Sequence, residues 1–154
     1  MGGTSLFAVS NRSNHEHIHG KTDETIYFYD RDDPYYEFTN FWVSPMKIDN
    51  KWYKTAEHYF QSQKFSYDHD LSKKVRNANG PMDAFRLAQD HSSKTRNDWH
   101  GSMGVKEGVM LKALQEKFTQ NEKLKHLLLS TCDKKLVEDS PKDDYWGIGS
   151  DGRG

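Results

Sequence analysis

Three side chains able to do acid–base or nucleophilic chemistry lie at helical spacing in the run TAEHYFQSQKF (residues 55–65). At about 100° per residue, Glu57, Gln61 and Lys64 (i, i+4 and i+7) fall on one face, with Phe60 beside them. Aromatic walls favour the acid form of a carboxyl group, which suits proton transfer near neutral pH. A lysine in the same enclosure becomes a nucleophile towards a carbonyl or imine carbon. The spacing therefore indicates an acid and an amine at one site, although a solvated polar helix face has the same spacing.

The helix that would carry these groups has its own signals. Thr55 is a typical N-cap residue, and Glu57 in the first turn suits the positive end of the helix dipole. The bulky residues form no single apolar arc, because Tyr59 lies opposite the polar face while His58 and Phe65 lie to the side. We therefore expect a helix that is covered on several sides.

A small sheet is expected to precede this helix. Residues 26–29 (IYFY) form a β-branched and aromatic run that ends at the turn-forming residues 30–34. Residues 46–48 and 51–53 flank Asp49–Asn50, and these two residue types tolerate the positive φ of a tight turn. The pattern predicts a hairpin that leads directly into the helix.

Most of the remaining chain is predicted to be helical. Helices are expected over residues 71–78, 82–89, 105–118 and 122–130, with a polar loop over 91–99 and a strand over 135–138. Met110, Ala113, Leu114 and Phe118 share one side of their helix, which is typical of core packing. The expected fold class is α+β and predominantly helical: a single domain over residues 25–154, with a small N-terminal sheet and hairpin packed on several helices. A flexible arm is expected over residues 1–24.

Composition limits the function classes. The 154 residues carry a net charge of −1, which argues against a nonspecific electrostatic grip on DNA or RNA but leaves room for a local basic patch. The single cysteine, Cys132, excludes an intramolecular disulfide, and its place after a leucine-rich helix predicts burial. No apolar run approaches a membrane-spanning length, and no signal peptide is evident. We expect a soluble cytoplasmic protein, or a nuclear one in a eukaryote, of undetermined oligomeric state.

Metal and cofactor motifs are weak. His15, His17 and His19 alternate, but no Cys or carboxylate set accompanies them at ligand spacing, so we expect neither a metal site nor a cofactor. Residues 140–154 contain four glycines, whose backbone could approach a phosphate or could simply form a flexible tail. Aromatic side chains such as Trp99 and Trp146 could stack a base. Together with the acid and the amine, they favour a nucleotide-like or glycosylamine substrate.

Seven motifs follow one another along the chain: F-T-N-F (38–41), T-A-E-H-Y-F-Q-x-Q-K-F (55–65), K-x-R-N-D-W (94–99), V-x-x-x-A-L-x-x-K-F (109–118), L-L-L-S-T (127–131), L-V-E (136–138) and D-x-Y-W-G (143–147). With the hydrophobic hairpin, this series resembles the NADAR family, which includes the YbiA-like N-glycosidases. The resemblance covers about residues 26–154, and the ordered series of motifs makes it specific.

The resemblance implies hydrolysis of the C–N bond of ribosylated amines. Family activities include removal of ADP-ribose from the exocyclic amino group of guanine in nucleic acid, and cleavage of ribosylamino-pyrimidine intermediates of riboflavin synthesis. In both substrates the sugar C1 is attached to an exocyclic amine. We expect an N-glycosidase, with ADP-ribosylated guanine in nucleic acid as its first substrate and partner. The alternatives are the ribosylamino-pyrimidines, a non-catalytic module that binds ADP-ribose, and a weaker third option, a purely structural partner domain.

A ribosylated exocyclic amine can open its ribose to an imine, and we hypothesise that Lys64 attacks this imine, that Glu57 moves protons, and that Asp143 assists or holds a ribose hydroxyl. By the resemblance, the substrate-binding residues would be Asn40, Phe41, Phe60, Gln61, Arg96, Trp99, Tyr145, Trp146 and Gly147. Arg96 could equally anchor a loop. Two departures matter: Ile148 stands where relatives often have Asp, and the K-N-x-L-G run and closing helix that usually follow are not seen. If that helix is missing, the pocket is expected to be open on one side.

Overall fold

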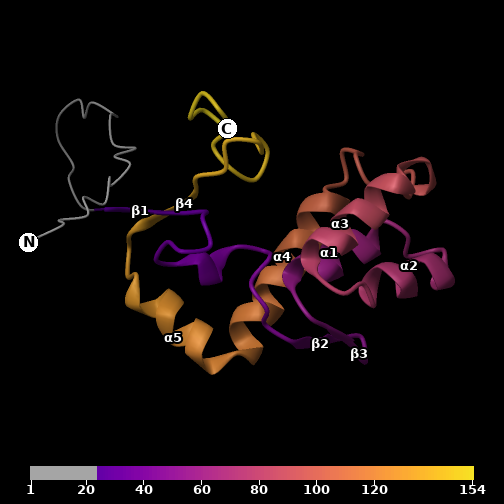
Figure 1. Ribbon diagram of the computed structural model, residues 1–154, viewed down its shortest axis with the longest axis horizontal. Coiled ribbons are helices and arrows are strands. Elements are labelled where there is room, and N and C mark those ends of the chain that lie inside the picture. The colour runs from indigo at the N-terminus through magenta and orange to yellow at the C-terminus, as the bar shows by residue number, and fades with distance from the viewer. Residues whose placement is uncertain (1–23) are drawn as a thin grey trace, which may run out of the picture.

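The computed structural model describes residues 24–154 (Figure 1). The alternating histidines at 15, 17 and 19, and the predicted arm up to residue 23, lie outside the described residues. The elements are β1 (Thr25–Phe28), a 3-10 helix (Tyr36–Phe38), β2 (Met46–Ile48), β3 (Lys51–Tyr53), α1 (Ala56–Gln63), α2 (His69–Arg76), α3 (Pro81–Asp90), a second 3-10 helix (Ser92–Lys94), α4 (Val105–Gln120), α5 (Glu122–Ser130) and β4 (Lys135–Glu138). The expected α+β, mainly helical class is confirmed.

Helix α1 occupies the centre of the fold. Figure 1 shows it among α2, α3 and α4, with the β2–β3 hairpin at one end of this group. Its Tyr59 packs with the hairpin and Ala113 of α4, its Phe60 packs with Trp99 and Met110, and Phe65 just beyond it packs against α2 and α3. Residues 56–62 are all buried. The helix lacks a single apolar arc because it is surrounded, as its sequence predicts.

The start of α1 is fixed by its cap. The Thr55 hydroxyl accepts the backbone N–H of His58 at 3.1 Å, which confirms the N-cap prediction. The same hydroxyl lies 2.8 Å from Nδ1 of the His58 ring, whose Nε2 lies 3.1 Å from the Ala78 carbonyl oxygen. This buried chain of hydrogen bonds fixes the end of α1 from which the Glu57 side chain projects.

The strands form two separate two-stranded sheets, which differs from the single small sheet expected at the N-terminus. The β2–β3 hairpin is as predicted, with φ of 48° at Asp49 and 63° at Asn50. Strand β1, however, pairs in parallel with β4, in a register that places Phe28 opposite Glu138. A parallel pair so distant in sequence leaves no local signal. This pairing brings the segments after both strands to one place, beside α1.

The single cysteine does not lie in the core. Cys132 is exposed, with φ of 50° in the turn after α5, so the prediction that it is buried is wrong. The turn that follows the leucine-rich helix lifts the residue out of the core.

Among residues 24–154, no helix is both long and apolar enough to cross a membrane.

Candidate active site

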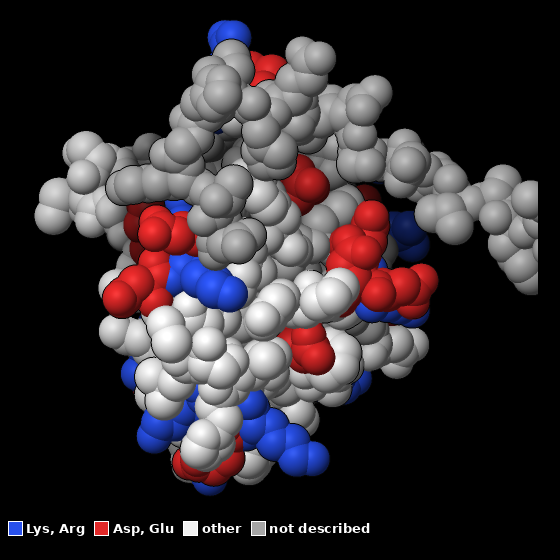
Figure 2. Space-filling model, turned by 90° about the vertical axis from the view of Figure 1, so that its left-hand side faces the viewer, with Lys and Arg blue, Asp and Glu red and all other residues white. Residues whose placement is uncertain are grey.

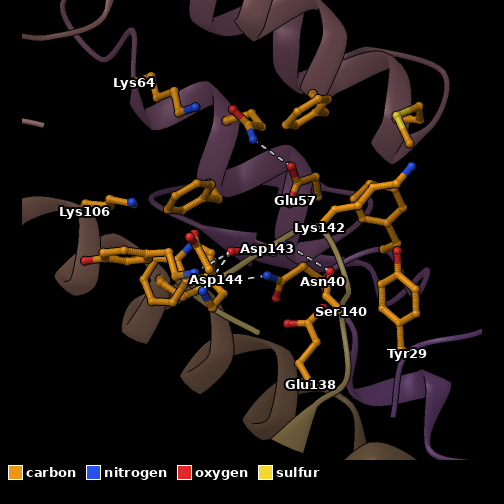
Figure 3. A pocket seen from close by; sticks show the side chains of 18 of the residues that line it. Tyr29, Asn40, Glu57, Lys64, Lys106, Glu138, Ser140, Lys142, Asp143 and Asp144 are labelled. Atoms are coloured by element: carbon orange, nitrogen blue, oxygen red, sulfur yellow. Dashed lines mark hydrogen bonds between the residues drawn. The ribbon is translucent and has the colours of Figure 1, made fainter. Parts of the chain in front are cut away.

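A cavity of about 750 Å³ lies where the segments after β1 and β4 meet α1, α3 and the start of α4. This volume is within the usual range for small-molecule sites. Ten of the twelve predicted site residues line it: Asn40, Phe41, Glu57, Phe60, Gln61, Lys64, Trp99, Asp143, Tyr145 and Trp146. Figure 3 shows the labelled side chains converging on this space from α1, α4 and the C-terminal segment.

Glu57 is 7% exposed and is held from two directions. Its backbone N–H donates to the Asn40 carbonyl at 3.0 Å, and its Oε1 accepts a hydrogen bond from Gln61 Nε2 at 2.7 Å. Burial raises the pKa of Glu57 to about 7, and the carboxylates of Glu138 and Asp143 add to the rise, whereas Gln61 and Lys64 oppose it. A carboxyl group with this pKa can both give and accept a proton near neutral pH.

Lys64 caps the C-terminal end of α1 and keeps helical backbone angles. Its Nζ lies 5.7 Å from the ring centroid of Phe60 and 5.9 Å from that of Trp99. Burial lowers the pKa of Lys64, and the positive charge of Lys106 lowers it further, while Glu57 opposes both. The amine is thus biased towards its neutral, nucleophilic form.

Gln61 lies between the acid and the amine on the same helix face. Its amide nitrogen donates a hydrogen bond to Glu57, but its Oε1 is buried and has no hydrogen-bond partner among residues 24–154. A buried acceptor left unpaired is costly, and one that faces a cavity is suited to an O–H or N–H donor from a ligand.

Asp143 shapes the loop that carries the Tyr145–Trp146 pair. Its Oδ1 accepts the backbone N–H groups of both Tyr145 and Trp146 at 2.9 Å. Trp146 then packs edge-on against Phe60, with ring centroids 5.9 Å apart. The Asp143 carboxylate therefore positions the aromatic wall, and its second oxygen has no such hydrogen bond within the described chain.

The structure places Arg96 outside the cavity. Its guanidinium holds Asp98 through two hydrogen bonds of 2.5 and 2.7 Å and donates to the Ser66 hydroxyl at 3.2 Å. Its backbone N–H donates to the Lys64 carbonyl at 2.8 Å. This geometry favours the loop-anchor interpretation, with Arg96 acting on Lys64 through the backbone.

Gly147 is likewise absent from the cavity wall. A Cβ at this position would stand 2.8 Å from the Ser140 Cβ, 2.9 Å from the Asp143 carbonyl oxygen and 3.0 Å from that of Glu138. These contacts are too close for any side chain. The glycine lets the loop fold back on the end of β4, which places Tyr145 and Trp146 against the cavity.

Comparison with known proteins decides the family. Residues 27–153 match the NADAR domain. The chain is 44% identical over 136 residues to N-glycosidase YbiA of Escherichia coli K12, covering 88% of this chain and 82% of the relative. The NMR structure of that E. coli protein superposes with a TM-score of 0.76, covering 88% of this chain and 79% of the other. The chain belongs to the NADAR family.

A further relative has a longer chain. A riboflavin biosynthesis protein of Vibrio vulnificus is 38% identical over 132 residues, which cover 86% of this chain and 35% of the relative. The matched region in that protein is therefore one part of a larger polypeptide.

Several cavity residues of this NADAR chain were not predicted, chiefly Lys106, Glu138 and Lys142. Glu138 follows from the β1–β4 pairing, which no local pattern revealed, although it ends the L-V-E motif. Lys106 could have been noticed in the sequence, because a cation in the first turn of a helix is unfavourable next to the positive end of the helix dipole. Lys117 could also have been noticed, because it interrupts the apolar side of α4.

The acidic side of the cavity is formed by Glu57, Glu138 and Asp143. Burial raises the pKa of Glu138, and the charge of Asp143 raises it further, while Lys117 opposes the rise. Within residues 24–154, no three His, Cys, Asp or Glu side chains are arranged to hold a metal ion. The site chemistry that these residues themselves support is proton transfer and attack by an amine.

Proposed function

We propose that this chain is an N-glycosidase that hydrolyses the bond between ribose C1 and an exocyclic amine, with ADP-ribosylated guanine in nucleic acid as its main substrate. The observation that carries the proposal is that Glu57 and Lys64 line one cavity with their pKa values shifted towards each other. Titratable groups whose pKa values are strongly perturbed inside a cavity are typical of catalytic acids, bases and nucleophiles. The relative YbiA is named an N-glycosidase, which supports the reaction class.

The first step opens the sugar. Glu57 in its acid form gives a proton to the ring oxygen as the C1–O bond breaks, and the nitrogen lone pair completes a C1=N bond. An exocyclic nitrogen can form this imine readily because its lone pair is not held within a ring aromatic system. The unpaired Gln61 Oε1 is suited to accept a hydrogen bond from a sugar hydroxyl or from the amine.

The second step transfers the sugar to the protein. The neutral Nζ of Lys64 adds to C1, a proton passes from Nζ to the departing nitrogen, and the C1–N bond breaks to release the free amine. Water then adds to the imine between C1 and Lys64, with the Glu57 carboxylate taking its proton. Cleavage of the C1–Nζ bond returns the lysine and releases the sugar as an aldose.

Two other functions remain in competition. The Vibrio vulnificus relative is named a riboflavin biosynthesis protein, which favours a ribosylamino-pyrimidine as the alternative substrate. A non-catalytic module that binds ADP-ribose would use the same aromatic wall. The cavity volume of about 750 Å³ accommodates either class of ligand.

Borohydride trapping tests the chemistry. Each substrate is incubated with the protein and sodium borohydride, and peptide mass analysis locates the reduced adduct, which we expect on Lys64. Lys64→Ala should lose turnover and trapping while still binding ADP-ribose, and Lys112→Ala, an exposed lysine of α4, should behave as the unsubstituted protein. Release of amine without any trapped adduct would favour direct attack by water with Glu57 as base. A protein that binds ADP-ribose but releases nothing from either substrate is a binding module.

A further inference from the structure

Two lysine side chains enter the cavity at the same end. Figure 3 shows Lys64 from α1 and Lys106 from α4 with both ammonium groups pointing inward, on the side away from Tyr29. They are near enough that the charge of Lys106 acts on the pKa of Lys64. Two cations at one end of an enclosed site repel each other unless an anion joins them.

Lys106 is held in place by aromatic rings and not by an acid. Its Nζ lies 3.3 Å from the ring centroid of Tyr145 and 5.5 Å from that of Trp146. The Tyr145 hydroxyl donates to Glu107, which fixes the ring that supports the lysine. Among residues 24–154, neither Lys64 nor Lys106 forms an ion pair with a carboxylate.

Three acids near this end already accept hydrogen bonds from other groups. Glu57 of α1 accepts from Gln61, one oxygen of Asp143 accepts from two backbone N–H groups, and Glu107 of α4 accepts from Tyr145. Asp144 also lines the cavity, but among residues 24–154 neither it nor Asp143 forms an ion pair with Lys106. The half-buried ammonium group of Lys106 is held by aromatic rings and pairs with no carboxylate of the described residues, so it is suited to bind an anionic ligand.

The proposed chemistry says which anion this is. If Lys64 attacks C1 of the sugar, the ribose lies at this end of the cavity, and the substrate's negative charge closest to the ring is the phosphate on C5′. We propose that Lys106 is a specificity-determining residue that binds the C5′ phosphate of the ribose whose C1 is attacked by Lys64. This inference rests on the proposed function and adds to it the requirement for a phosphorylated ribose, whichever amine is released.

A binding experiment tests the phosphate subsite without turnover. Calorimetric titration with ribose 5-phosphate and with ribose compares the two ligands on the Lys64→Met background, which prevents adduct formation. We expect ribose 5-phosphate to bind about 10- to 100-fold more tightly than ribose, in line with one charge-assisted hydrogen bond. Adding Lys106→Gln should abolish this preference, and Lys106→Arg should keep most of it. Lys142→Gln, which alters the third lysine of the cavity, should leave the preference intact.

A kinetic experiment separates this proposal from the function it rests on. The kcat/KM for a ribosylamine with and without the 5′-phosphate is measured for the unsubstituted protein and for Lys106→Gln. We expect the variant to lose about 10- to 100-fold on the phosphorylated substrate, mainly in KM, and to change little on the other. Its acid limb of the pH profile should move to higher pH, because the Lys64 amine has lost a neighbouring cation.

The outcomes are distinct. If the protein hydrolyses both substrates and Lys106→Gln leaves their ratio unchanged, or if Lys142→Gln removes the phosphate preference instead, the Lys106 assignment is wrong and the N-glycosidase function stands. If neither substrate is hydrolysed but the affinity for ribose 5-phosphate still depends on Lys106, the phosphate subsite stands and the proposed catalytic function is wrong.

Discussion

At the scale of single residues, the decisive feature is that one short helix supplies both an acid and an amine to the same cavity. Glu57 is driven towards its neutral form by burial and by neighbouring carboxylates, and Lys64 is driven towards its neutral form by burial and by Lys106. The two groups form no ion pair, although each charge favours the charged form of the other. Both shifts favour the uncharged forms, in which the carboxyl group can donate a proton and the amine can attack a carbon.

The pH dependence of Glu57→Gln checks the role of the acid. Ring opening needs protonated Glu57, so kcat/KM of the unsubstituted protein should fall as pH rises through the pKa of about 7. Glutamine keeps a hydrogen-bonding group beside Gln61 but cannot transfer a proton. We expect Glu57→Gln to lose about 10²- to 10⁴-fold in kcat and to lack this alkaline limb. Glu122→Gln, at an exposed position of α5, should retain the kcat and the alkaline limb of the unsubstituted protein. An unchanged alkaline limb in Glu57→Gln would mean that another group is responsible for the titration.

The residues that the sequence did not reveal escaped prediction for two different physical reasons. Glu57, Gln61 and Lys64 could be placed on one face because helical periodicity is local. Glu138 reaches the same cavity only through the parallel pairing of β1 with β4, which depends on contacts between distant segments. Lys106 and Lys117 break local rules, one at a helix N-terminus and one on an apolar side, and such conflicts are expected where function or positioning overrides local preference.

At the scale of elements, α4 holds the F-T-N-F segment against α1. Lys117 is fully buried, and its Nζ donates to the Thr39 carbonyl at 2.6 Å. The next residue, Asn40, lines the cavity and accepts the backbone N–H of Glu57. The hairpin and α1 were predictable from turn residues and capping. The interruption of the apolar side of α4 marks Lys117 as unusual, but its bond to the Thr39 carbonyl was not predictable, because the two residues are far apart in the sequence.

The buried lysine gives stability a distinctive pH dependence. Burial lowers the pKa of Lys117 to about 7, with Glu138 and Glu37 opposing the shift. From about pH 7 up to the ordinary lysine range, the unfolded chain binds a proton that the folded protein does not. The free energy of unfolding should therefore rise with pH across this window, and the cost of burying the charge is fully present below it.

Lys117→Met tests this linkage by urea unfolding at pH 6, 7.5 and 9. The free energy of unfolding of the variant should not increase between pH 7.5 and 9. Relative to the unsubstituted protein, the variant should therefore be most stable at pH 6. It also leaves the Thr39 carbonyl without its donor, which costs about 1–3 kcal/mol at every pH. Lys112→Met, on the exposed side of α4, should keep the increase. An increase of equal size in Lys117→Met would mean that Lys117 is charged in the folded state.

At the scale of the whole molecule, the distribution of charge bears on which substrate class the cavity serves. The chain has a net charge of −1. Figure 2 shows the end of the molecule near β1, β4 and α5, where acidic and basic side chains are interspersed and the visible described residues of this face form no continuous basic surface. A second, much smaller concavity is lined by Lys51, His69, Lys73 and Arg76, and it shares no lining residue with the main cavity.

A nucleic-acid substrate would therefore be bound through its modification and not through its backbone. Proteins that contact 6–10 phosphates lose about 10³- to 10⁵-fold in affinity between 50 and 200 mM salt. For an oligonucleotide carrying ADP-ribosylated guanine, we expect the Lys64→Met protein to lose less than about tenfold over this range, which corresponds to about one phosphate contact. Fluorescence anisotropy with the modified and unmodified oligonucleotides measures this slope, and only the modified one should bind. Lys73→Gln should not alter the slope. A steep slope that Lys73→Gln reduces would instead place the nucleic-acid backbone on the small basic concavity and make charge, not the modification, the main source of affinity.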